Sequence, residues 1–67
     1  MNVAIRWEAA QIHLQDGNGA LARVALDPAM FDKHGGKLAA PARAVLATLD
    51  ASDAAAALAA LHGGGTR

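Results

Sequence analysis

Hydrophobic and polar residues alternate on both sides of a glycine-rich tetrapeptide in the first half of the chain. Apolar side chains occupy the even positions of residues 10–14 and of residues 22–26, and Asp-Gly-Asn-Gly at 16–19 separates the two runs. A period of two is typical of a half-buried strand, and a short Gly/Asn turn between two such runs is typical of a β-hairpin. We therefore predict an antiparallel β-hairpin over residues 11–26.

The register of this hairpin depends on the length of its turn. A three-residue loop over 17–19 pairs Leu14 with Ala22 and Ile12 with Val24, so that the apolar residues share one face. We prefer it to a two-residue turn, which mixes polar and apolar residues on that face. The opposite face then carries the polar side chains Gln11, His13, Gln15 and Arg23.

The preceding segment, residues 2–8, alternates as well, but with the opposite parity. Its large apolar side chains are Val3, Ile5 and Trp7. In one straight strand these odd positions fall on the polar face. Either a bulge near residues 9–10 restores the parity, or Ile5 and Trp7 face another protein. Trp7 therefore has two interpretations, an anchor of the core or an interface residue.

A helix over residues 3–15 is the competing interpretation of the same segment. Asp16-Gly17 would end this helix, and its apolar residues recur at the spacing of one helical face. That face would consist of Val3, Trp7, Ala10 and Leu14. The strand interpretation is preferred, and the helix is kept as the alternative.

The chain after the proposed hairpin has the end signals and spacing of short helices. Asp27-Pro28 combines an N-cap with a first-turn proline, and Gly35-Gly36 ends the helix predicted over residues 28–34. The following helix tolerates Pro41 only near its first turn. Its apolar positions are Leu38, Ala42, Val45, Leu46 and Leu49.

A break over residues 50–53 precedes the last predicted helix, which ends at His62. Ser52 or Asp53 provides its N-cap. Its narrow apolar face consists of Ala54, Ala57, Leu58 and Leu61. The three glycines that follow predict a stop.

These elements predict a small α+β protein. Its N-terminal β-hairpin, extended by residues 2–8 to three short strands in one version, is packed by two or three Ala-rich helices. Residues 1–62 would form the single domain, and residues 63–67 a flexible Gly-rich tail. An all-α bundle is the alternative fold.

Alanine dominates the apolar composition and limits the core that the chain can build. The 67 residues are 54% hydrophobic, but 19 of them are alanine and only 17 are Leu, Val, Ile, Met, Trp or Phe. Ordering a residue costs roughly 1.5 kcal/mol and burying a large apolar side chain returns about 1.5–3 kcal/mol, so such a core is marginal. Cysteine is absent, which excludes disulfides and thiolate metal sites. We therefore expect association, with a second copy or with a partner, to support the fold.

Charge and hydropathy disfavour several classes of partner. Six Lys and Arg balance six Asp and Glu, and the basic residues are dispersed, whereas nucleic-acid-binding proteins usually carry a basic excess or stripe. No apolar run is as long as a membrane span, and the N-terminus lacks the apolar region of a signal peptide. We expect a cytoplasmic protein without membrane contact, for which nucleic acid is not the favoured partner.

Residues with catalytic or metal-binding chemistry are few and widely separated. His13, His34 and His62 lack the close pair that metal sites usually contain, and the glycine clusters fit helix ends better than a phosphate-binding loop. Ser52 is best explained as a helix cap. We therefore predict no catalytic residue, no metal site, no cofactor and no enzymatic activity.

The favoured function is a small protein-binding module, an inhibitor or adaptor that occludes a surface of a larger bacterial complex. Phage-encoded antagonists of host systems are one class of that kind. The alternative is a homo-oligomeric, antitoxin-like regulator that contacts nucleic acid weakly through paired β-hairpins. We expect a protein partner, with a homodimer as a second option. The candidate partner-binding residues are Ile5, Arg6, Trp7, Gln11, His13, Gln15 and Arg23.

Overall fold

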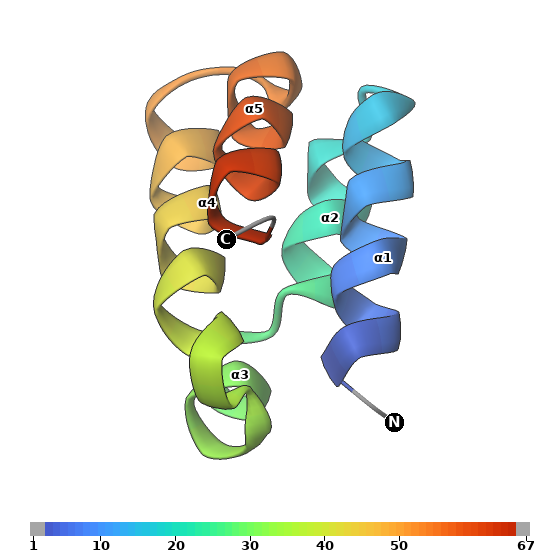
Figure 1. Cartoon of the computed structure of the whole chain (residues 1–67). Coiled ribbons are helices and arrows are strands. Elements are labelled where there is room, and N and C mark those ends of the chain that lie inside the picture. Colours follow the sequence, from blue (N-terminus) through green and yellow to red (C-terminus); the bar gives the residue numbers. More distant parts are fainter. Residues whose placement is uncertain (1–2, 66–67) are drawn as a thin grey trace.

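The computed structural model describes residues 3–65, and 87% of these residues are helical (Figure 1). Strands are absent from this part of the chain. The helices, in chain order, are α1 (Val3–Gln15), α2 (Gly19–Ala25), α3 (Pro28–His34), the one-turn 3-10 helix η1 (Gly36–Leu38), α4 (Ala39–Ala51) and α5 (Ala54–Gly65).

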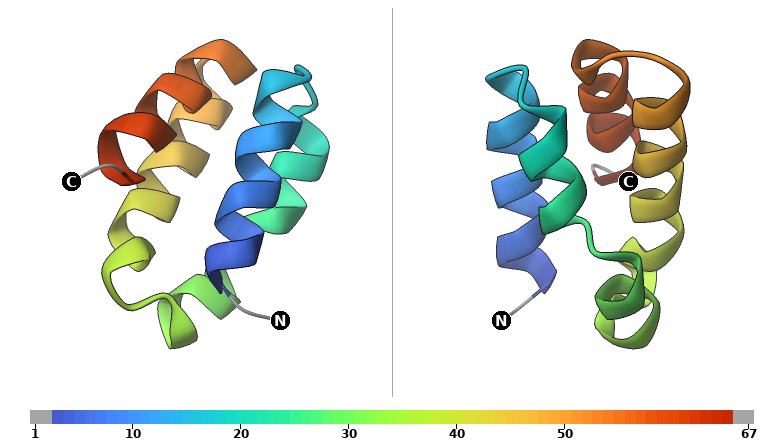
Figure 2. Two further views of the ribbon diagram at one scale, coloured as in Figure 1. Left: turned by 45° about the vertical axis from the view of Figure 1, so that its right-hand side comes forward. Right: turned by 180° about the vertical axis from the view of Figure 1, so that it is seen from behind.

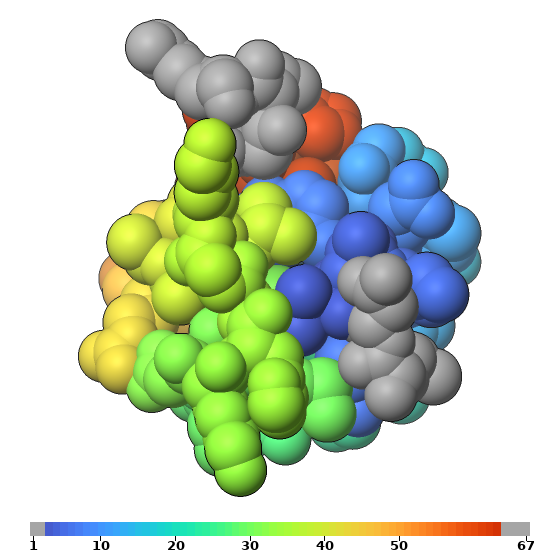
Figure 3. All heavy atoms as spheres, turned by 60° about the horizontal axis from the view of Figure 1, so that its bottom comes forward, coloured from blue at the N-terminus to red at the C-terminus, as the bar shows by residue number. Residues whose placement is uncertain are grey.

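Two helical hairpins face each other across the core. α1 and α2 form the first helical hairpin, and α4 and α5 form the second; the helices within each hairpin are antiparallel (Figure 1). α1 also packs against α5. Two further views show the pairs as two layers, joined at one end by α3 and η1 (Figure 2). Seen from that end, α3 and η1 lie beside the first turn of α1 (Figure 3). The whole fold measures 26 × 21 × 18 Å.

The predicted α+β fold is wrong, because residues 11–26 form the end of α1, a tight loop and α2 instead of a β-hairpin. The loop contains the glycine-rich tetrapeptide: Gly17 has a φ of +74°, and the Asn18 side chain accepts a hydrogen bond of 3.1 Å from the Leu21 amide. Asn18 therefore acts as the N-cap of a helix. Alanine, leucine and glutamine make up most of both segments, and these residues favour a helix over a strand.

The alternative helix over residues 3–15 is confirmed, and with it the all-α fold. Trp7, Ala10 and Leu14 are buried on one face of α1, and Val3 packs against the same core. This stripe resolves the parity problem of the strand interpretation, because Trp7 points inward while Ile5 points to solvent. The interpretation of Trp7 as a core anchor is confirmed.

After residue 27, the predicted helix over residues 28–34 and the predicted cap of the last helix are confirmed, whereas the break predicted over residues 50–53 is shorter, because α4 continues through Ala51. The Asp27 side chain accepts a hydrogen bond of 3.1 Å from the Ala29 amide, and Pro28 occupies the first turn of α3. The Asp53 side chain accepts one of 3.0 Å from the Ala56 amide, which makes it the cap of α5. Local side-chain chemistry therefore determines where these helices begin.

The end of α5 differs from the expected boundary. The sequence predicts a tail from residue 63, but α5 continues through Gly65. The last two tail residues, Thr66 and Arg67, lie outside the described part of the chain.

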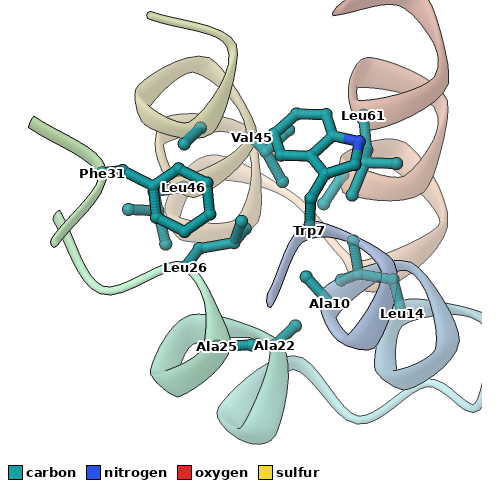
Figure 4. Close-up of a cluster of buried hydrophobic side chains, with 12 residues drawn as sticks. Trp7, Ala10, Leu14, Ala22, Ala25, Leu26, Phe31, Val45, Leu46 and Leu61 are labelled. Carbon is teal, nitrogen blue, oxygen red and sulfur yellow. The ribbon is translucent and has the colours of Figure 1, made fainter. Parts of the chain in front are cut away.

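The core is built around two aromatic side chains (Figure 4). The Trp7 indole lies near Val45 and Leu61, and the Phe31 ring lies near Leu26 and Leu46. The two ring centroids are 6.4 Å apart, with the rings tilted by 51°. Alanines fill much of the remaining interior: Ala10, Ala22, Ala25, Ala42 and Ala57 are buried. This composition allows close helix approach but supplies little apolar area.

Candidate functional site

The seven residues predicted to bind a partner do not share one environment. Ile5, Gln15 and Arg23 are exposed, and Arg6, Gln11 and His13 are partly buried. Trp7 is only 8% exposed and belongs to the core. All seven lie on the first hairpin, but the structure does not bring them together as the outer face of a strand. Whether any of them binds a partner stays a prediction.

Arg6 connects the two helices of the first hairpin. Its Nη1 donates to the backbone oxygens of Val24 and Ala25, at 3.3 and 3.2 Å. These carbonyls lie at the end of α2, where helical partners run out and a positive charge is favourable. Arg6 therefore has a structural role, and it places the C-terminal end of α2 level with the first half of α1.

Arg23 connects the first hairpin to the second. It forms an ion pair with Asp50, close to the end of α4. On the second hairpin, Arg43 pairs with Asp32 of α3, and the hydrogen bond and charge of Asp32 raise the pKa of Arg43 above its ordinary value. Both pairs are exposed, so each contributes modestly to stability.

Exposed large aliphatic side chains form a separate feature of the first hairpin. Among the described residues, four such side chains are exposed, and none of them lies on α3, α4 or α5. We call this set the outer apolar face: Ile5 (56% exposed), Ile12 (57%), Leu21 (47%) and Val24 (67%). Of these four residues, the sequence predicted only Ile5 as a binding residue, because the strand interpretation assigned Ile12 and Val24 to the core.

The helical phase of α1 explains the exposure of its two isoleucines. Ile5 and Ile12 are seven residues apart and so share one side of the helix. That side lies about 180° from the buried stripe, at 100° per residue. They therefore point directly away from the core. The helix alternative for residues 3–15 contained this signal, since it leaves both isoleucines off the apolar stripe.

On α2, the exposed apolar residues lie on the flank beside α1. The opposite flank is occupied: Gly19 packs against Leu49, and Arg23 pairs with Asp50. Leu21 and Val24 are on the other side of the helix. Because Arg6 reaches the last carbonyls of α2, Val24 lies level with the first half of α1 and Leu21 with its second half.

The outer apolar face is thus one continuous strip over both helices. At 1.5 Å per residue, Ile5 and Ile12 lie about 10.5 Å apart along α1, whereas Leu21 and Val24 lie about 4.5 Å apart along α2. Val24 is therefore the nearer of the two to the level of Ile5 and Leu21 the nearer to the level of Ile12, and the partly buried Ala9 lies between the isoleucines on α1. The Arg6 guanidinium lies between the two helices, at the carbonyls of Val24 and Ala25, and further charges occupy the two long edges. Glu8 occupies the edge of α1 away from α2, and Arg23 occupies the edge of α2 away from α1.

The remaining surface presents little of the chemistry of a catalytic or metal site. Residues 3–65 contain no pocket and no group of three or more His, Asp or Glu side chains that could hold a metal ion. His13, His34 and His62 lie on α1, α3 and α5, each near the C-terminal end of its helix. In the same part of the chain, no helix is long and apolar enough to cross a lipid bilayer.

The outer apolar face is consequently the strongest candidate for a functional site in the described chain. It is a two-helix surface, of the kind that packs against another helical surface. Comparison with known proteins adds no relative to this argument, since no protein-family model, curated protein or solved structure matches the chain.

Proposed function

We propose that this chain is a small, non-enzymatic protein-binding module and that the outer apolar face is its binding surface. One observation carries the proposal: every exposed large aliphatic side chain in residues 3–65 lies on the first hairpin. Helical phase places these side chains along its outer side. Scattered exposed apolar residues are ordinary on protein surfaces, whereas a contiguous patch is typical of an interaction site.

The size of the strip supports the same proposal. Together its four side chains expose on the order of 400 Å2, comparable with the largest apolar patches of monomeric proteins, which are often functional. The whole chain exposes 3974 Å2, so this strip is a substantial part of a very small surface.

The second hairpin provides an internal comparison. Its exposed positions carry small residues, including Ala44, Ala47, Ala55 and Ala59, and polar or charged ones such as Arg43 and Asp50. Both hairpins have the same helical architecture, but only the first carries large apolar side chains outside. The difference favours a binding role for the first hairpin over a general consequence of small size.

A module of this kind acts by occupying a surface of its partner. An inhibitor or adaptor that covers part of a larger bacterial complex fits the dimensions of the strip, because two short helices can fill a groove or cap a helical face. The nucleic-acid alternative loses its structural basis, since the paired β-hairpins that it required are helices.

Site-specific photo-cross-linking in the native host tests the proposal. A photoreactive amino acid at Ile12 or Val24 should yield protein adducts, whereas the same residue at Ala47 or Ala55 should not. All four positions are exposed helical sites, so they differ in the face that they sample. Adducts that form equally from both faces, or from neither, would contradict the proposal.

A further inference from the structure

We propose that the partner of the outer apolar face is a second copy of this chain, bound through a two-fold symmetric pairing of the first hairpins. The inference rests on the proposed function, because it names the occupant of the same surface. In this dimer, α1 and α2 of one copy would pack against α1 and α2 of the other, so that four helices form the interface.

The four aliphatic side chains would form the centre of a small dimer interface and not its whole area. A stable interface buries about 800 Å2 on each partner, which is roughly twice what the four aliphatic side chains provide. The surrounding small and polar residues of α1 and α2, including Ala9, Ala20 and Gln15, can supply a rim. The interface would therefore use nearly the entire outer side of the first hairpin.

Two-fold symmetry allows two ways to stack one hairpin on the other. With the axis parallel to the helices, α1 of one copy lies over α2 of the other, so that Ile12 meets Leu21 and Ile5 meets Val24 across the interface. With the axis perpendicular to the helices, α1 lies over α1 in the antiparallel direction, and Ile5 meets Ile12. Apolar contacts alone do not choose between them.

Charge favours α1 over α2. Glu8 is exposed near the middle of α1, and no described basic side chain pairs with it. In the α1-over-α1 arrangement the two Glu8 side chains approach each other, which is unfavourable. In the α1-over-α2 arrangement each Glu8 approaches Arg23 of the second copy. Arg23 uses Nη2 for Asp50 and keeps further N–H donors for another carboxylate.

The composition of the core gives an independent reason for a second copy. Of the twelve buried hydrophobic residues, five are alanine, so the single chain buries little apolar area for its length. Chains of this size that lack disulfides and metals commonly gain stability from association. A dimer would bury the largest apolar area that the monomer leaves in water.

Single-cysteine variants test the arrangement directly, since the natural chain has no cysteine. Ile12→Cys and Leu21→Cys chains are mixed and oxidised mildly, and the mixture should form a 12–21 disulfide-linked dimer. Each variant alone should form far less, because the symmetry holds identical positions about one interhelical distance, roughly 8–10 Å, apart. Ala47→Cys and Ala55→Cys provide the matched pair on the second hairpin and should remain monomeric.

Light scattering on the natural chain provides the second measurement. It should show a mass twice 6.8 kDa, and Ile12→Glu should weaken the dimer about tenfold or more while leaving the helical circular dichroism unchanged. Ala47→Glu adds the same charge to the other hairpin and should leave the dimer intact. Cross-linking of Ile5→Cys with Ile12→Cys in place of the 12–21 pair would overturn the proposed arrangement.

The failure of the dimer can be distinguished from the failure of the proposed function. A natural chain that stays monomeric at all concentrations overturns the dimer. If photo-cross-linking from Ile12 then captures a different protein, the binding function stands with another partner. If it captures nothing, both proposals fail.

Discussion

Trp7 and Ile12 are both large apolar residues of α1, and their environments are opposite. Trp7 is 8% exposed and contacts the centre of the core, whereas Ile12 is 57% exposed. Only the first of them therefore contributes substantially to the stability of an isolated chain. The contrast allows stability and binding to be separated by single substitutions.

Trp7→Ala should lower the free energy of unfolding by about 3–5 kcal/mol, because it leaves a large cavity beside Phe31. Ile12→Ala, measured at concentrations low enough for the chain to be monomeric, should change it by about 0.5 kcal/mol or less. Urea denaturation followed by circular dichroism measures both. Similar losses for the two variants would show that the assignment of these residues to core and surface is incorrect.

Gly35 and Gly63 provide a second contrast at single positions. A Cβ at Gly35 would lie 2.3 Å from the backbone oxygen of Phe31, so the backbone must shift to accept alanine, whereas a Cβ at Gly63, within α5, would meet nothing within 4 Å. Gly35→Ala should therefore destabilise the protein by about 1 kcal/mol or more. Gly63→Ala should stabilise it by up to about 1 kcal/mol, because alanine favours a helix. Thermal unfolding of the two variants should shift in opposite directions, and a shift in the same direction would argue against one of these environments.

At the level of the helices, α2 depends strongly on its ends. It has seven residues, too few to be stable alone. The Asn18 side chain caps its first turn, and Arg6 donates to the carbonyls at its last turn. These contacts, together with the buried Ala22 and Ala25, hold α2 against α1.

Asn18→Ala should cost about 1 kcal/mol of stability, because it leaves an N-terminal amide of α2 without its acceptor. Asn18→Asp keeps a side-chain oxygen at the same place and should stay close to the natural protein. Chemical denaturation gives the two free energies, and amide hydrogen exchange of α2 shows whether the loss is local. Equal stability of the alanine and aspartate variants would mean that the cap has no energetic role.

The same segment explains why the sequence predicted a β-hairpin. Leu14, Ala22 and Leu26 are buried in the structure, as the strand interpretation required. Leu14 lies four residues after the buried Ala10, and Leu26 four residues after Ala22, and this spacing fits both a period of two and one face of a helix. Ile12 and Val24 separate the two interpretations, because a strand buries them and a helix exposes them. Sequence alone offers no measure of that exposure.

Helix ends were predictable where the signal is local. Asp27, Pro28 and Asp53 act through neighbouring backbone groups, so their roles follow from the order of residues. The candidate site was only partly predictable. Ile5 and Ile12 follow from the phase of a helix over residues 3–15, but Leu21 and Val24 depend on which flank of α2 meets α4. That choice is a tertiary contact without a local signal.

For the whole molecule, a lean interior and an apolar exterior are two aspects of one composition. The largest fully buried side chains are Phe31, Leu26, Leu61 and Val45, while four aliphatic residues of comparable size remain outside. Moving them into the monomer core would require a different packing of α1 and α2. Association buries them without changing the fold, so stability and assembly should be linked.

This linkage predicts that the melting temperature rises with protein concentration. A partner that binds only the folded chain stabilises it by mass action, and for a dimer of this size each tenfold increase in concentration should raise the melting temperature by roughly 5 °C. Ile12→Glu should remove most of this dependence, whereas Ala47→Glu should retain it. Scanning calorimetry over a wide concentration range measures the effect. A melting temperature of the natural chain that is independent of concentration would contradict the linkage, and the outer apolar face would then have to be covered by a different protein.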